Sequence, residues 1–210
     1  MGKKTNRGGR VAIARGVDHL CAGDEVIARI AEEHGHPGFP GPYTPFEAMV
    51  RSILSQQISG AAARTIIGRV EHLAGGLATP RNLVELGDAD LRSCGVSSQK
   101  VRYLGSLIDH VERGIVDFDT IGDLDDVEVI DRLTAVTGIG VWTAKMFLIF
   151  SLGRLDVLPH EDLGVRNGMM RAYRLAELPG KREVERIAEE RNWSPYRSVA
   201  SWYMWRATES

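Results

Sequence analysis

The sequence predicts an all-α protein, because signals for helix starts recur along the chain while signals for β-hairpins are scarce. Apolar residues return at spacings of three and four, which is the period of one helix face. Ser, Thr or Asp precedes most of these segments, and each of these residue types can cap a helix N-terminus. We therefore expect about ten helices joined by short loops.

Length and composition are those of an ordinary globular chain. The 210 residues are 43% hydrophobic and 26% charged, and no apolar stretch approaches the ~20 residues that cross a bilayer. The formal net charge of −2 disfavours binding to nucleic acid by charge alone, so a nucleic-acid site would have to be local. We expect a monomer that is cytoplasmic, and associated with the nucleoid if the chain is bacterial.

The two cysteines, Cys21 and Cys94, lie far apart in the sequence and form no CxxC pair. This spacing predicts neither a disulfide framework nor a thiolate metal site. The first ten residues, 1–10, are basic and rich in glycine, and we expect them to form a disordered tail.

The first helices are predicted from the residues expected at their ends. Asp24 is placed to cap a helix that Gly35 ends. Thr44 is the expected cap of the next helix, with Pro45 at its first position. The apolar residues of that helix follow helical spacing and predict a mostly buried element: Phe46, Met49, Val50, Ile53 and Leu54.

Short capped helices continue through the rest of the chain. The expected caps are Ser59, Thr79, Asp88 and Ser97. The later helices are expected in "DVEVIDRLTAV", in the apolar run after Gly140, after Asp162, in "KREVERIAEER" and in "SPYRSVASWYMWRA".

Two glycines one residue apart, Gly138 and Gly140, lie between a helix that ends near Val136 and a helix that begins at Val141. Glycines at both positions permit positive φ and let another backbone approach closely. The unpaired N–H groups and positive dipole end of the new helix suit a phosphate oxygen. The pattern therefore predicts a helix–hairpin–helix that grips the DNA backbone, although a tight helix corner with glycines for packing remains the alternative.

A carboxylate follows this hairpin at a proline-marked turn. Asp162 lies 20 residues beyond Trp142, at the start of another helix, with Leu163 and Val165 expected to turn inward. On spacing alone, such an aspartate is most often only a helix cap. A metal cluster made with its neighbours His160 and Glu161 is disfavoured, because three adjacent residues rarely converge on one ion.

The segments "TGIGVWTA" and "DVLPHEDLGVRNG" resemble the helix–hairpin–helix DNA glycosylases that share a Gly/Pro-rich loop and an aspartate, in particular the AlkA-type 3-methyladenine DNA glycosylases. The segments "FEAMVRSILSQQIS", "CGVSSQKVRYLGSLI" and "WSPYRSVASWYMW" are also similar to this family. The resemblance covers about residues 11–208. It implies one glycosylase domain, 11–210, in which two helical subdomains flank a DNA-binding cleft and no N-terminal β domain precedes them. A helical barrel at about 44–150 would be one subdomain, and 11–40 with 151–210 would pack as the second.

The resemblance implies a monofunctional glycosylase that excises alkylated purines of the 3-methyladenine and 7-methylguanine type from double-stranded DNA. Relatives that also cleave the backbone carry a lysine where this chain has Trp142, and Lys145 lies at a different angle on the helix. No cofactor is expected, because the four C-terminal cysteines of the iron–sulfur branch are missing. The resemblance allows a monovalent cation on the hairpin carbonyls.

The resemblance also implies the roles of individual residues. Asp162 would be the catalytic carboxylate, because its spacing to Val165 and Arg166 fits the family, whereas Asp156 and Glu161 do not fit. Gln57 would fill the gap left by the flipped base, although many AlkA-type members have an apolar residue there. The base pocket would comprise Trp142, Trp205, Tyr43, Phe46, Trp202 and Met146, the last of which is aromatic in some members. DNA contacts would come from Gln57, Gln56, Ser59, Thr137, Gly138, Ile139, Gly140, Thr143 and Arg166.

Three other functions are compatible with the sequence. The same scaffold can excise hypoxanthine, ethenoadenine, uracil or a mispaired base, although His160 is the only evident general acid. A DNA-binding module without activity could use the hairpin alone, but it would not need Asp162, which repels phosphates. An all-α scaffold protein with purely structural glycines is the third alternative.

Overall fold

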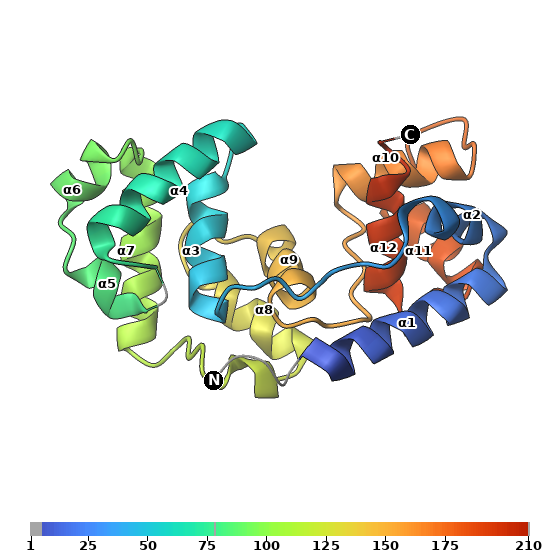
Figure 1. The fold of residues 1–210 in the computed structure, drawn as a ribbon, viewed down its shortest axis with the longest axis horizontal. Helices are drawn as coiled ribbons and strands as arrows, with labels where there is room; N and C mark the ends of the chain where they lie inside the picture. Colours follow the sequence, from blue (N-terminus) through green and yellow to red (C-terminus); the bar gives the residue numbers. More distant parts are fainter. Residues whose placement is uncertain (1–5, 78, 210) are drawn as a thin grey trace. The chain divides into compact units, whose positions relative to one another are not determined.

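The computed structural model describes residues 6–77 and 79–209, which form twelve α-helices and one 3₁₀ helix without any strand (Figure 1). This confirms the predicted all-α class. The chain divides into two compact units. The central unit is Pro42–Leu152, and the terminal unit combines Met1–Gly41 with Gly153–Ser210. Among the described residues, no helix is long and apolar enough to cross a membrane.

The central unit is built around α3 (Pro45–Ser55), which packs against three other helices of the unit, α4, α7 and α9. Its apolar face is fully buried, as its spacing predicts. The other elements of the unit are α4 (Gly60–Ala74), α5 (Pro80–Val84), α6 (Asp88–Ser93), α7 (Ser98–Glu112), η1 (Ile121–Asp123), α8 (Asp126–Thr134) and α9 (Val141–Phe150).

Most predicted helix starts in the central unit are confirmed. The hydroxyl groups of Thr44, Ser59 and Ser97 each accept a hydrogen bond from the backbone N–H three residues later. The predicted cap at Asp88 is wrong by one position, because Gly87 is the N-cap of α6 and Asp88 is its first helical residue. A glycine takes the cap's extended conformation readily, and the Asp90 carboxylate accepts the Gly87 N–H instead.

The terminal unit contains helices from both ends of the chain. They are α1 (Asn6–Gly23), α2 (Glu25–His34), α10 (Leu163–Ala172), α11 (Lys181–Glu190) and α12 (Arg197–Arg206). Helix α12 packs against α10, α2 and α1, and six of its ten residues are buried. It is therefore the central helix of this unit.

A buried carboxylate joins distant segments of the terminal unit. Asp24 is 1% exposed, and its Oδ1 caps α2 by accepting the N–H groups of Val26 and Ile27. Its Oδ2 accepts the Tyr173 hydroxyl at 2.5 Å and the Trp193 indole N–H at 3.2 Å. Both oxygens are therefore hydrogen-bonded, as a buried carboxylate requires.

The expected disordered tail, 1–10, is partly contradicted. Residues 1–5 lie outside the described part of the chain, whereas residues 6–10 are the first residues of α1. Each glycine makes a helix less favourable by about 1 kcal/mol. Gly8 and Gly9 therefore weaken the helix signal in this part of the sequence. The helix is stabilised instead by its tertiary contacts with α2 and α12.

Candidate active site and DNA-binding hairpin

The predicted hairpin lies between α8 and α9, but its two glycines serve different purposes. Gly138 has φ +89°, and a Cβ there would lie 2.3 Å from the ring of Tyr103. Gly140 has φ −97° and ψ 172°, and a Cβ there would meet nothing within 4 Å. Gly138 thus uses the positive φ that glycine permits, whereas Gly140 does not. Gly138 is needed for the turn and its packing, while Gly140 leaves open space beside the start of α9.

Side chains of the central unit hold the hairpin from two sides. The Gln56 side-chain N–H donates to the Gly138 backbone oxygen at 3.0 Å, and the Thr137 N–H donates to Ser106 Oγ at 3.0 Å. Ile139 is 5% exposed and anchors the loop in the core. The hairpin is therefore braced by the loop after α3 and by α7.

Helix α7 supplies two of these contacts through residues that the sequence analysis missed. Tyr103 covers Gly138, and its hydroxyl accepts the Gln99 amide N–H at 2.5 Å. Gln99, Tyr103 and Ser106 follow helical spacing, so they share one face of α7. This polar and aromatic stripe was the signal in the sequence that could have identified them.

The end of α3 is held by an ammonium group from α7. Lys100 Nζ donates to the Leu54 backbone oxygen at 2.7 Å, and burial lowers the pKa of Lys100 below its ordinary value. This lysine satisfies one of the carbonyl groups that a helix C-terminus leaves without an intrahelical partner. It therefore fixes the point from which Gln56 and Gln57 emerge.

A pocket of about 480 Å³ opens beside the hairpin in the central unit. Its lining residues are Ser52, Ser55, Gln56, Gln57, Tyr103, Gly138, Trp142 and Thr143. Trp142 is 45% exposed, unlike the core tryptophan that its apolar helix would suggest, whereas Thr143 is 6% exposed. The pocket thus combines an accessible aromatic face with several side chains that can form hydrogen bonds.

The predicted wedge, Gln57, lies in a strained loop. It is exposed and has φ +54°, a conformation that non-glycine residues rarely adopt. The loop is fixed on both sides, because Gln56 is bonded to Gly138 and Ser59 caps α4. Such strain persists only where the surrounding structure imposes it, and it is common at functional sites.

In the terminal unit, Asp162 caps α10 and is held by two donors. Its Oδ1 accepts the Val165 backbone N–H at 2.8 Å and the Trp205 indole N–H at 2.8 Å. The residue is 8% exposed and lies at the positive end of the helix dipole. Val165 is buried as expected, but the inward orientation expected for Leu163 is wrong, because this first-turn residue is 58% exposed.

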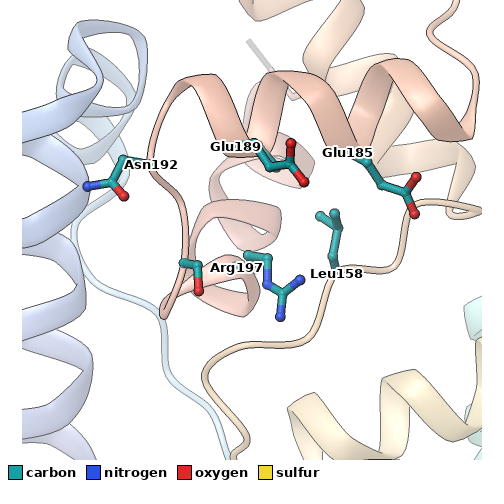
Figure 2. A pocket seen from close by; sticks show the side chains of 7 residues that line it. Leu158, Glu185, Glu189, Asn192 and Arg197 are labelled. Atoms are coloured by element: carbon teal, nitrogen blue, oxygen red, sulfur yellow. The ribbon is translucent and has the colours of Figure 1, made fainter.

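The competing carboxylate, Asp156, forms an ion pair with Arg197 within the terminal unit. The Arg197 side chain donates to both of its oxygens, at 2.7 and 2.9 Å. Arg197 also lines a pocket of about 350 Å³, with Glu185 and Glu189 projecting from α11 above it (Figure 2).

His160 lies 3.5 Å from Glu161 and 3.8 Å from Glu185. Among the described residues, no three His, Cys, Asp or Glu side chains are grouped as metal ligands would be.

The remaining predicted base-pocket residues differ in accessibility. Phe46 is 3% exposed and packs edge-on against Phe118, so it is a core residue of the central unit rather than a wall of an open pocket. Tyr43 is 46% exposed, with the Arg51 guanidinium 4.1 Å from its ring centre. Met146 lies one turn beyond Trp142 on α9 and is half-buried. These residues belong to the central unit.

Two predicted residues of the terminal unit interact with their own unit. Trp202 is half-buried, with the Arg206 guanidinium 5.2 Å from its ring centre. Arg166, a predicted DNA contact, donates through Nε to the Pro179 backbone oxygen at 2.7 Å. This bond ties the segment that follows α10 back to the helix. The predicted contact between Arg166 and DNA stays a prediction.

The model of the HhH-GPD superfamily of base excision DNA repair proteins matches residues 50–193, more than half of the chain. The protein therefore belongs to the HhH-GPD superfamily.

The chain is also similar to individual members of this superfamily. DNA-3-methyladenine glycosylase 1 of Schizosaccharomyces pombe is 35% identical over 168 residues, which cover 79% of this chain and 73% of the relative. The crystal structure of a DNA-3-methyladenine glycosidase from Bacillus halodurans aligns with a TM-score of 0.83 and 39% identity, covering 93% and 89% of the two chains. The S. pombe 3-methyladenine DNA glycosylase Mag1 in complex with abasic DNA aligns with a TM-score of 0.78 and 32% identity, covering 93% and 97%.

Proposed function

We propose that the protein is a monofunctional DNA glycosylase of base excision repair, which hydrolyses the N-glycosidic bond of alkylated purines and leaves an abasic site. The observation that carries the proposal is the buried Asp162 carboxylate, which two N–H groups hold at the start of α10. Relatives named DNA-3-methyladenine glycosylase support the substrate class. We further propose that it acts on double-stranded DNA as a cytoplasmic monomer.

The proposed chemistry is electrostatic. As the bond between base and sugar breaks, positive charge develops on the sugar, and a carboxylate beneath the ring lowers the barrier and can orient the attacking water. Asp162 suits this role because its orientation is fixed before the substrate arrives. No metal ion or cofactor takes part in the proposed chemistry, and a monovalent cation on the hairpin carbonyls would serve DNA binding only.

The proposed base pocket uses the exposed face of Trp142. An alkylated purine carries positive charge, and an electron-rich ring attracts it by about 1–2 kcal/mol. Tyr43 of the same unit is a further candidate for stacking. Trp205 belongs to the terminal unit, where its indole N–H donates to Asp162. A pocket of this kind discriminates weakly, so the lability of the damaged base's own bond would supply much of the selectivity.

The proposed DNA grip is the hairpin. The first N–H groups of α9 lack intrahelical partners, and the space beside Gly140 admits a phosphate oxygen. Gln57 would enter the gap left by the flipped nucleotide. Because backbone N–H groups and the helix dipole would make these contacts without a cluster of lysines, the net charge of −2 does not argue against them.

The test is a gel assay of base release from duplex oligonucleotides that carry 7-methylguanine, a 3-methyladenine analogue, hypoxanthine, ethenoadenine or uracil. The wild type should release the alkylated purines, and Asp162→Asn should be slower by roughly 100-fold or more, although Asn still caps the helix. Asp125→Asn is the matched control, because Asp125 also caps a helix, α8, and this change should leave the rate unaltered. The proposal fails if the wild type releases none of these bases or if Asp162→Asn is as fast.

The absence of backbone cleavage needs a separate assay. Trp142 offers no amine for a Schiff base, so abasic DNA should stay intact without alkali and should not become trapped on the protein by borohydride. A borohydride-dependent cross-link would contradict the monofunctional assignment while leaving the glycosylase assignment in place.

A further inference from the structure

Helices α10 and α12 approach each other at the backbone. A Cβ at Gly168 of α10 would lie 1.8 Å from the backbone oxygen of Met204 in α12. No side chain fits in this space, so Gly168 sets the closest approach of the two helices. Gly164 lies four residues earlier, on the same face of α10.

At Gly164 the neighbour is a side chain of the candidate active site. A Cβ there would lie 2.7 Å from Cδ1 and 3.0 Å from Nε1 of Trp205, and 3.0 Å from Oδ1 of Asp162. The indole ring thus lies directly against the Gly164 backbone while its N–H reaches the carboxylate over 2.8 Å. The added methyl group would touch the donor atom and the acceptor atom of this hydrogen bond.

We propose that Gly164 is a positioning residue, whose missing side chain lets the Trp205 indole N–H hold the Asp162 carboxylate in its reactive orientation. This inference rests on the proposed function. Gly164 contacts neither the sugar nor the base in this proposal. It acts on Asp162 through Trp205, and this is a different role for Trp205 from the base stacking that the sequence predicts.

Two donors make the orientation specific. The Val165 N–H belongs to α10, the helix that Asp162 caps, whereas the Trp205 N–H comes from α12. The second donor therefore ties Oδ1 to α12 as well as to α10. Small displacements of a catalytic group can lower rates strongly.

The experiment compares Gly164→Ala, Trp205→Phe and the double variant. Trp205→Phe keeps an aromatic ring and removes the N–H donor. Gly68→Ala is the matched control, because Gly68 lies inside α4 and a Cβ there meets nothing within 4 Å. Three quantities are measured: the single-turnover rate of base release with enzyme in excess, the affinity for a duplex with an abasic-site analogue, and the melting temperature.

We expect Gly164→Ala and Trp205→Phe each to slow base release by about 10-fold or more, as for a lost hydrogen bond to a charged group. Affinity for the abasic analogue should stay within about twofold, because that ligand has no base to stack. The double variant should be about as slow as the slower single variant, because both changes break the same contact. Rates that multiply, or a Gly164→Ala rate equal to that of the wild type, overturn the proposal.

A second measurement does not depend on activity. The indole N–H resonance of Trp205, assigned with the Trp205→Phe variant, should shift in Gly164→Ala and stay in place in Gly68→Ala. An unshifted resonance overturns the proposed contact even if the wild type proves inactive, which would contradict only the proposed function. If Gly164→Ala does not fold, adding Trp205→Ala should restore folding, and a double variant that also fails to fold overturns the contact.

Discussion

The Gln56 side chain donates a hydrogen bond to the backbone oxygen of Gly138 over 3.0 Å, although 82 residues separate the two in the sequence. This bond connects the loop after α3 with the hairpin before α9. The residue next to Gln56 is the predicted wedge, Gln57, and Gly138 belongs to the predicted phosphate grip. Within the central unit, the two elements expected to contact DNA are therefore held together.

Gln56→Ala should weaken DNA binding without unfolding the protein. The substitution removes one hydrogen bond that braces the hairpin, which corresponds to about 1 kcal/mol or roughly fivefold in affinity. Fluorescence anisotropy with an abasic-analogue duplex measures this loss. Gln56→Glu should bind DNA at least as weakly as Gln56→Ala, because a carboxylate cannot donate to the Gly138 oxygen. Wild-type affinity in both variants would show that the brace is not needed.

The two hairpin glycines should respond differently to alanine. Gly138→Ala forces a Cβ into the Tyr103 ring at φ +89°, so we expect a loss of stability on the order of 1–3 kcal/mol. Gly140→Ala meets no protein atom within 4 Å and should melt near the wild-type temperature, yet bind DNA more weakly. Thermal melts and binding titrations separate the two effects. A stable Gly138→Ala variant, or full affinity in Gly140→Ala, contradicts this division.

Gly168→Ala should be among the most damaging small substitutions in the terminal unit. Its Cβ would lie 1.8 Å from the Met204 backbone oxygen, and backbone cannot move aside as a flexible side chain can. Overpacking of this kind costs about 1–3 kcal/mol or more. Urea unfolding measures it, with Gly68→Ala as the control for adding a methyl group to a helix interior. Equal midpoints for the two variants would show that α10 and α12 can separate easily.

Stability should fall at alkaline pH because of Tyr173. Burial, followed by the neighbouring Asp24 carboxylate, raises the pKa of the Tyr173 hydroxyl above its ordinary value. The folded protein therefore holds this proton more tightly than the unfolded chain. The resulting stability is complete below the unfolded-state pKa of about 10 and is lost as the pH rises further, by at most about 1.4 kcal/mol per pH unit.

Tyr173→Phe tests this account by urea unfolding between pH 7 and pH 11. At pH 7 the variant should be less stable, because the Asp24 Oδ2 atom loses its 2.5 Å donor and keeps only the Trp193 N–H. Above pH 10 its stability should decline less steeply than that of the wild type. Parallel declines in the two proteins would assign the alkaline loss to other groups.

The sequence predicted those features that depend on local spacing. The caps at Thr44, Ser59 and Ser97 and the start of α9 at Val141 follow from residue types at fixed offsets, and the structure confirms them. The different roles of Gly138 and Gly140 could not be predicted, because the sequence shows where glycines occur but not their φ angles. The first turns of α1 were missed because contacts with other helices outweigh their weak helix propensity.

The arrangement of the candidate site was less predictable. The identities of Asp162 and Trp205 followed from the resemblance, but the hydrogen bond between them joins residues 43 positions apart and has no local signature. Ser106 was missed for the same reason, since its bond to Thr137 spans 31 residues. Phe46 was predicted to line the base pocket, but it is 3% exposed. Aromatic character alone does not distinguish a core residue from a pocket wall.

The division of the terminal unit between the two ends of the chain has a consequence for synthesis on the ribosome. Helices α1 and α2 leave the ribosome before the central unit, and the whole central unit follows before α12, their packing partner, has been translated. Asp162 likewise leaves the ribosome before Trp205. A nascent chain can therefore complete the hairpin while the Asp162 carboxylate still lacks its indole donor. The proposed DNA grip would then form during translation earlier than the proposed catalytic group.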